Sequence, residues 1–177
     1  PFLPYSRDPK TLARPWALPG TPGLEHRIGG LAKADLTGNV SYDPENNQKM
    51  TQLRAEKIRR IADDIPPAEI HGPESGKLLV LGWCGTYGAI YQALEEIQAE
   101  EGVKVSHVHL NYLNPFPKNL GEILKRFKTV LIPELNMGQL LLLIRFHFPG
   151  VQAVGLNKVQ GLPFHAEEIK AKIKELL

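Results

Sequence analysis

The sequence has only one cysteine, Cys84, among its 177 residues. One thiol cannot form a disulfide within the chain, build a cysteine-rich zinc site or hold an iron–sulfur cluster that needs four thiolates. We therefore predict a reducing, cytoplasmic compartment and no metal centre held by this chain alone.

Long apolar runs and an excess of one charge are also lacking. The run Leu140–Ile144 is far shorter than the roughly 20 apolar residues that cross a bilayer, and no basic-then-apolar leader opens the sequence. The 21 Lys and Arg residues nearly balance the 19 Asp and Glu residues, and they are spread along the chain. We expect neither a membrane nor a nucleic acid among its partners.

Proline is abundant at the start of the chain. Proline and glycine recur through residues 1–42 and leave little room for regular structure, so we predict an extended strap with a possible hairpin. The chain starts at Pro1 without an initiator Met, and proline-rich straps often connect domains, so we expect the back part of a longer polypeptide. Asp43 followed by Pro44 predicts the start of an amphipathic helix within residues 43–65.

Beyond residue 76 the pattern changes to alternating strands and helices. Apolar runs of strand length lie at residues 77–83, 103–113, 128–135 and 151–156, and a segment with helical periodicity follows each of them. Strands without polar alternation are buried on both faces, which indicates a parallel sheet. We predict an α/β fold with three α/β/α layers over residues 77–177, preceded by a linking region over residues 1–76.

Ligands of such sheets bind beyond the carboxyl ends of the strands, which directs attention to the loops there. The first loop, Gly82 to Gly88, joins a strand to a helix N-terminus, where free N–H groups could bind an anion. Its glycine spacing is not that of a dinucleotide-binding turn, and tight-turn packing explains it as well. The anion-binding candidates are Gly82, Cys84, Gly85, Thr86 and Gly88.

No catalytic set is evident at the other candidate positions. Cys84 would need a base as a nucleophile, and His107 with His109 supply only two metal ligands on one strand face. Packing is the favoured explanation of all three residues. Charged groups in the strap at Glu25, His26 and Arg27 favour contact over catalysis. Glu134 follows a strand, and it could form a polar rim with Asn136, Lys158 and Gln160.

Five phrases of the sequence together resemble the carboxy-terminal part of the alpha subunit of 2-oxoacid:ferredoxin oxidoreductases, the 2-oxoglutarate branch in particular. The resemblance covers nearly the whole chain, with one departure: Asn47 stands where the family often has a histidine. The phrases are Pro22–Gly30 (PGLEHRIGG), Gly38–Asn46 (GNVSYDPEN), Leu113–Leu120 (LNPFPKNL), Pro133–Leu140 (PELNMGQL) and Asn157–Phe164 (NKVQGLPF).

This resemblance implies a transketolase C-terminal-like domain from about Lys77, in which an earlier segment can add one antiparallel strand. It implies a parent complex that uses thiamine diphosphate, Mg²⁺ and an iron–sulfur cluster to make an acyl-CoA and reduce ferredoxin. The cofactor-binding and substrate-binding motifs would lie in upstream domains and on a beta subunit. This segment would supply no catalytic residue and would be inactive alone.

Two alternatives stay open at this point. The chain could be the equivalent domain of a pyruvate or indolepyruvate oxidoreductase, or of a two-subunit 2-oxoacid dehydrogenase. It could also be a stand-alone flavodoxin-like module that binds a nucleotide at the Gly82 to Gly88 turn. The sequence fixes neither the 2-oxoacid nor the oligomeric state.

Overall fold

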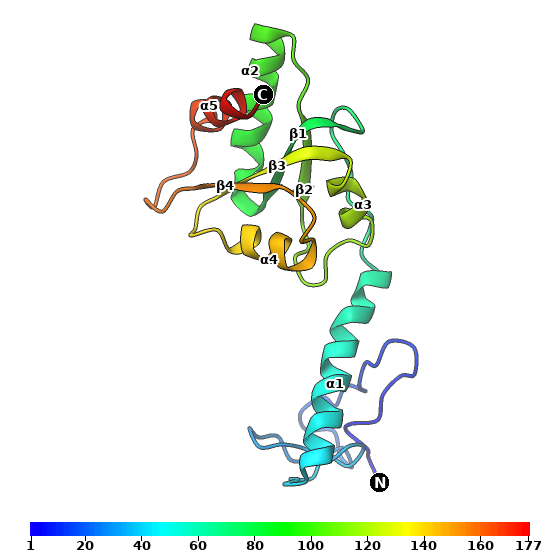
Figure 1. Cartoon of the computed structure of the whole chain (residues 1–177). Helices are drawn as coiled ribbons and strands as arrows, with labels where there is room; N and C mark the ends of the chain where they lie inside the picture. Colours follow the sequence, from blue (N-terminus) through cyan, green and yellow to red (C-terminus); the bar gives the residue numbers. More distant parts are fainter. The chain divides into compact units, whose positions relative to one another are not determined.

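A computed structural model describes all residues, 1–177, and the chain divides into two units, 1–65 and 66–177 (Figure 1). The second unit begins earlier than the predicted start near Lys77. Two contacts tie residues 66–76 to it: His71 forms an antiparallel bridge with His107, and the N–H group of Ala68 donates to Asn119 Oδ1 at 2.8 Å. The bridge is a single pairing beside the sheet and not a full added strand.

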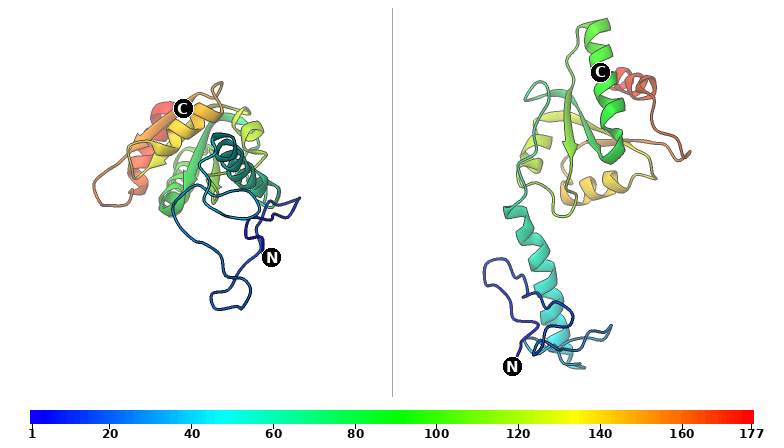
Figure 2. Two further views of the ribbon diagram at one scale, coloured as in Figure 1. Left: turned by 90° about the horizontal axis from the view of Figure 1, so that it is seen from below. Right: turned by 180° about the vertical axis from the view of Figure 1, so that it is seen from behind.

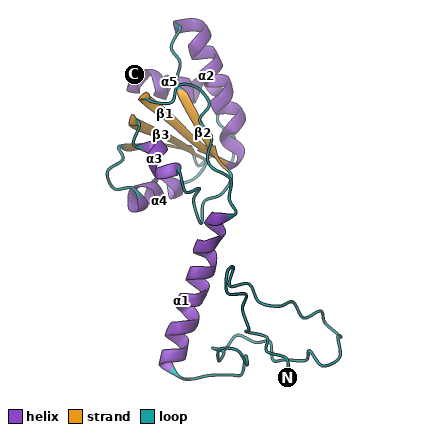
Figure 3. Cartoon of the chain, turned by 90° about the vertical axis from the view of Figure 1, so that its right-hand side faces the viewer, coloured by secondary structure: helices purple, strands orange, loops and turns teal.

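The first unit contains one long helix, α1 (Pro44–Arg60), continued by a short 3₁₀ turn, η1 (Ile61–Asp63) (Figure 3). The Asp43 carboxylate accepts a hydrogen bond from the Glu45 N–H group, and Pro44 occupies the first turn, as the sequence predicts. The residues before α1 form turns and two isolated antiparallel bridges, Tyr5 with Leu36 and Lys33 with Val40. The strap therefore contains hairpin-like single pairings but no β-strand.

The second unit is built on a four-stranded parallel sheet with the order β2-β1-β3-β4. The order reverses direction between β1 and β3, which makes the carboxyl ends of these two strands the switch point of the sheet. The strands are β1 (Gly76–Trp83), β2 (Ser106–Leu110), β3 (Phe127–Glu134) and β4 (Ala153–Asn157).

Helices cover both faces of this sheet (Figures 1 and 2). The short turn η2 (Cys84–Thr86) leads into α2 (Tyr87–Glu101), which packs on one face together with α5 (Ala166–Leu176). The opposite face carries α3 (Leu120–Leu124) and α4 (Gln139–His147). The predicted three-layer α/β/α architecture is confirmed. Helix α3 has only five residues, and Phe127 already belongs to β3.

The core consists of two apolar layers, one on each side of the sheet. Alternate residues of one strand enter opposite layers: Leu79 and Leu81 pack toward α3 and α4, whereas Leu78 and Val80 pack toward α2 and α5. All four side chains are at most 3% exposed. Both faces of the strands are thus buried from solvent, which explains why their sequences lack polar alternation.

The α2 and α5 helices are also joined by charge. The Lys170 ammonium group, on a residue that is 6% exposed, lies 2.9 Å from Glu96, 3.0 Å from Glu100 and 2.6 Å from Glu167. Hydrogen bonds to these three carboxylates raise the pKa of Lys170 above its usual value. A buried cation is tolerated here because its partners surround it.

Candidate functional site

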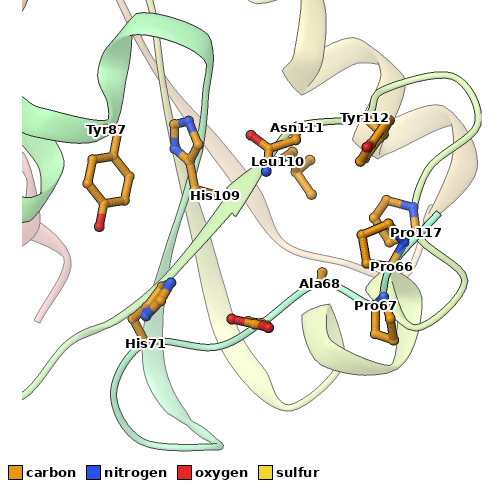
Figure 4. A pocket seen from close by; sticks show the side chains of 11 residues that line it. Pro66, Pro67, Ala68, His71, Tyr87, His109, Leu110, Asn111, Tyr112 and Pro117 are labelled. Carbon is orange, nitrogen blue, oxygen red and sulfur yellow. The ribbon is translucent and has the colours of Figure 1, made fainter.

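A cavity of about 470 Å³ lies beside the carboxyl end of β2 in the second unit (Figure 4). Its wall comes from three places in the chain: the proline-rich segment that opens the unit, the residues at and after the end of β2, and the first residue of α2. The lining residues are Pro66, Pro67, Ala68, Glu69, His71, Tyr87, His109, Leu110, Asn111, Tyr112 and Pro117.

Aromatic and imidazole rings gather at one side of this cavity. His107 and His109 lie on the same face of β2, as their spacing predicts, with ring centroids 5.7 Å apart. The Tyr87 ring is 5.1 Å from that of His109 and 5.6 Å from that of His107. His71 completes the group at 6.0 Å from His107. Figure 4 shows the side chains of His71, Tyr87 and His109 from three separate segments.

Both histidines on β2 favour the neutral form. Burial lowers the pKa of His107 to about 3, with smaller contributions from His109 and His71. Burial also lowers the pKa of His109, although a hydrogen bond with the Cys84 backbone opposes the shift. His107 Nε2 and His109 Nδ1 are buried without a hydrogen-bond partner. The cluster therefore places two rings that favour the neutral form side by side, His107 in the interior and His109 at the wall of the cavity.

Gly82 explains how two rings fit against the sheet. It pairs with His109 across β1 and β2, and a Cβ atom at this position would lie 2.5 Å from Ile90 Cδ1 and 3.0 Å from His109 Nδ1. Any side chain would thus collide with α2 and with the imidazoles. Packing accounts for this glycine without reference to a ligand.

The rest of the predicted anion-binding turn is held together by its own contacts. The Thr86 hydroxyl donates to the Trp83 carbonyl at 2.8 Å and accepts from the Trp83 N–H group at 3.2 Å. Cys84 has a φ of +53°, and Gly85 and Gly88 have open space at their missing Cβ atoms. The turn brings Gly82, Cys84, Gly85, Thr86 and Gly88 to one place, while anion binding there stays a prediction.

Glu134 has a clear local role. Its carboxylate is fully buried and accepts hydrogen bonds from the N–H groups of Leu140 at 2.7 Å and Leu141 at 3.0 Å. The Asn136 side-chain amide donates to it at 3.2 Å. Glu134 therefore satisfies two of the free donors in the first turn of α4 and complements the helix dipole.

The predicted polar rim around Glu134 is only half assembled. Asn136 contacts the carboxylate, but the Lys158 ammonium group instead lies 2.7 Å from Glu168 and donates to the Pro163 carbonyl at 2.9 Å. Gln160 is exposed. The Glu168 carboxylate also accepts from the His165 N–H group, so Lys158 belongs to the cap of α5.

The remaining charged cluster lies in the first unit. His26 Nδ1 lies 2.9 Å from the Leu24 carbonyl oxygen, and its ring meets that of Phe2 at a centroid distance of 5.4 Å. Glu25 and Arg27 make no ion pair. These contacts hold the strap locally and do not form a reactive centre.

Sequence reasoning missed two members of the ring cluster. His71 follows a proline-rich breaker and gives no sign that it pairs with β2, and Tyr87 reads as an ordinary helix-opening residue. The pairing of His71 with His107 depends on the backbone path of residues 66–76, which no short motif encodes.

No three His, Cys, Asp or Glu side chains of the chain are placed to hold one ion. Cys84 is exposed, and no hydrogen bond joins its thiol to a histidine. None of the helices is long and apolar enough to cross a lipid bilayer.

Known proteins similar to this chain include subunits of 2-oxoacid oxidoreductases, although no protein-family model matches it. The chain is 47% identical over 178 residues to the 2-oxoglutarate oxidoreductase subunit KorA of Mycobacterium tuberculosis, covering 100% of this chain and 27% of that protein. It is 29% identical to the alpha subunit of 2-oxoacid:ferredoxin oxidoreductase 2 of Aeropyrum pernix, covering 88% and 24%.

A solved structure of an enzyme of this class is also similar to the chain. The structure of 2-oxoglutarate:ferredoxin oxidoreductase from Magnetococcus marinus, with 2-oxoglutarate, coenzyme A and succinyl-CoA bound, matches 97% of this chain and 30% of its own. The TM-score is 0.84 at 30% sequence identity. The chain thus spans about a quarter to a third of the proteins it matches, and it is a homologue of the alpha subunits of 2-oxoacid:ferredoxin oxidoreductases.

Proposed function

We propose that this chain is the carboxy-terminal structural and interface part of the alpha subunit of a 2-oxoglutarate:ferredoxin oxidoreductase. The observation that carries the proposal is the 47% identity to a 2-oxoglutarate oxidoreductase subunit over the whole chain. The parent complex would use thiamine diphosphate, Mg²⁺ and an iron–sulfur cluster to convert the 2-oxoacid and coenzyme A into an acyl-CoA while reducing ferredoxin. These groups would be bound by the upstream alpha domains and a beta subunit.

The side chains of the second unit support a structural role. The carboxylate at the switch point, Glu134, already accepts hydrogen bonds from the first turn of α4, and burial favours the neutral form of both histidines of β2. We therefore propose that residues 66–177 shape and support a neighbouring active centre, and that residues 1–65 connect to it.

The outward side of α4 supplies a surface for that support. Leu142 is 65% exposed and Phe146 is 80% exposed, and their i, i+4 spacing places them on the same side of the helix. Met137, just before the helix, is also largely exposed. Large apolar side chains that gather in this way mark interfaces, so we propose that another part of the parent complex covers α4.

The stand-alone flavodoxin-like alternative receives less support. The strand order β2-β1-β3-β4 matches the first four strands of the five-stranded flavodoxin-like sheet. Two helices begin at the switch point, however, and the N-terminus of α4 already holds the Glu134 carboxylate. A melting-temperature increase with flavin mononucleotide, absent in a Thr86→Val variant, would favour this alternative.

One experiment tests the proposal in the full-length alpha subunit, produced together with its beta subunit. We expect 2-oxoglutarate-dependent and coenzyme-A-dependent ferredoxin reduction, lost on Phe146→Glu because a charge enters the covered face of α4. Lys104→Glu changes the charge at another exposed position of the unit and should leave assembly and activity intact. The separate 177-residue chain should show no Mg²⁺-dependent binding of thiamine diphosphate in calorimetry.

Two results would contradict the proposal in distinct ways. Normal assembly of the complex and normal activity with Phe146→Glu would remove the interface role of α4. If the complex turns over pyruvate or indolepyruvate but not 2-oxoglutarate, the chain belongs to a pyruvate or indolepyruvate oxidoreductase instead.

A further inference from the structure

Lys33 of the first unit is buried without a partner. The residue is 7% exposed, and its Nζ atom is enclosed and forms no hydrogen bond. A charged amine in such a place is costly unless a counter-charge satisfies it. Every other buried lysine in the chain has carboxylate partners: Lys158 meets Glu168, and Lys170 meets three glutamates.

The backbone holds Lys33 in this position. It forms an antiparallel bridge with Val40, and its carbonyl accepts a hydrogen bond from the Asn46 side-chain amide at 2.8 Å. The next residue, Ala34, donates to the Asn39 carbonyl at 2.7 Å. These bonds fix the direction in which the side chain leaves the strap, so its burial is a feature of the fold.

Lys33 lines a cavity of about 350 Å³ that lies wholly within the first unit. Two of the lining residues, Lys33 and Arg54, are cationic and none is acidic. The nearby acid Asp35 is already taken, since Arg7 lies 2.6 Å and Lys49 lies 2.7 Å from its carboxylate oxygens. The cavity is lined by Tyr5, Gly29, Gly30, Leu31, Ala32, Lys33, Asn47, Met50 and Arg54.

Uncharged donors stand at the same cavity. The N–H groups of Gly29, Gly30 and Leu31 donate no hydrogen bond within the chain. A Cβ atom on Gly29 would lie 3.8 Å from Lys33 Nζ, so this loop passes close over the amine. Arg54 makes no ion pair, and the Asn47 side-chain amide is unbonded. Two cations with several free N–H donors match a small anion that has several oxygens.

We propose that this cavity is a binding site for a phosphate group, with Lys33 and Arg54 as its cationic ligands and the Gly29–Leu31 backbone as a cradle. Inorganic phosphate carries between one and two negative charges near neutral pH, which the two cations balance. The proposal concerns the first unit alone and does not depend on the enzyme class of the parent protein.

The test follows the backbone amide signals of Gly29, Gly30 and Ala34 in NMR spectra of the ¹⁵N-labelled 177-residue chain during titration with inorganic phosphate. The ionic strength is kept constant with chloride, and a parallel titration uses acetate. We expect saturable shifts with phosphate at these residues and at the Asn47 side-chain amide. Lys33→Met should weaken binding at least tenfold, whereas Lys10→Met, which removes an exposed lysine of the same unit, should leave it unchanged.

Each other outcome counts for or against the site. Shifts that do not saturate, or that are the same in Lys33→Met, overturn it, and saturable lysine-dependent shifts with acetate at equal affinity would assign the cavity to carboxylates and not to phosphate. If Lys33→Met loses the dispersed signals of the strap, Arg54→Met provides the second test, because Arg54 is exposed on α1 and its loss should still weaken phosphate binding.

Discussion

The two units of the chain are stabilised by different means. In the second unit nearly all the buried apolar side chains form two layers around a sheet, whereas the first unit buries only Pro4, Leu12 and Met50 among its apolar side chains. The first unit relies on polar contacts, such as the Arg60 guanidinium group that donates to the carbonyls of Pro9 and Lys10 at 2.8 and 2.9 Å. Apolar burial therefore makes the second unit stable, and directional contacts define the path of the first.

The largest effect that tests this difference is the loss of one core side chain in the second unit. Leu131, at the centre of β3, is fully buried, so Leu131→Ala should lower the free energy of unfolding by about 3 to 5 kcal/mol. Leu142→Ala on the exposed side of α4 should change it by less than about 0.5 kcal/mol. Urea unfolding followed by circular dichroism measures both, and equal effects would contradict the assignment of the core.

This core is also the part of the molecule that the sequence predicts best. The apolar run at residues 77–83 and the run at 128–135 end within a residue or two of β1 and β3, because a strand buried on both faces must be apolar at every position. The amphipathic periodicity of α5 likewise matches its burial of Ile169 and Ile173. The local pattern is sufficient to predict these elements because the burial of each position determines whether its residue is apolar.

The site could be predicted only in part. The pattern places His107 and His109 on one face of a strand, and the structure agrees. It does not predict that His71 joins them or that Glu134 reaches forward to the N–H groups of α4, because both depend on the paths of loops. The sequence also does not predict that the Lys33 amine lacks a partner, because the groups around it are set by the path of the folded strap.

The next effect in size concerns the buried cap of α4. The variant Glu134→Gln replaces one carboxylate oxygen by an NH₂ group. The side chain then accepts a hydrogen bond from only one of the N–H groups of Leu140 and Leu141, so the unfolding free energy should fall by about 2 kcal/mol. Glu122→Gln on α3 makes the same change at an exposed ion pair and should have little effect. Chemical denaturation of the two variants checks this, and an unchanged midpoint for Glu134→Gln would refute the role of the cap.

A third effect depends on pH. The folded pKa of His107 is about 3, below the ordinary value of 6.5, so the unfolded chain binds the proton more readily between these values. This makes the second unit lose stability as the pH falls below about 6.5, by about 1.4 kcal/mol per pH unit or roughly 2 kcal/mol at pH 5. The groups that face this ring are His71, His109 and Tyr87.

The variant His107→Leu isolates this contribution. It should flatten the decline in unfolding free energy between pH 7 and pH 5, whereas His147→Leu, at an exposed histidine, should retain the slope of the original chain. Urea unfolding at several pH values gives the slopes. An unchanged slope in His107→Leu would show that other groups cause the acid sensitivity.

The smallest effect belongs to the first unit. Asp35 accepts ion pairs from Arg7 and Lys49, and hydrogen bonds with these two cations lower the pKa of its carboxyl group. Because the folded pKa is lowered, this stabilisation is present above about pH 3.8 and is lost as the pH falls below it.

The variant Asp35→Asn should lower the unfolding free energy by about 1 kcal/mol or less, as expected for a partly exposed pair. It should accelerate amide hydrogen exchange at Ala34, Gly38 and Ser41 by less than about tenfold, while exchange in β1 and β3 stays unchanged. Asp64→Asn, at an exposed acid of the same unit, is the matched control. Faster exchange in the sheet of the second unit would show that the two units are not stabilised independently.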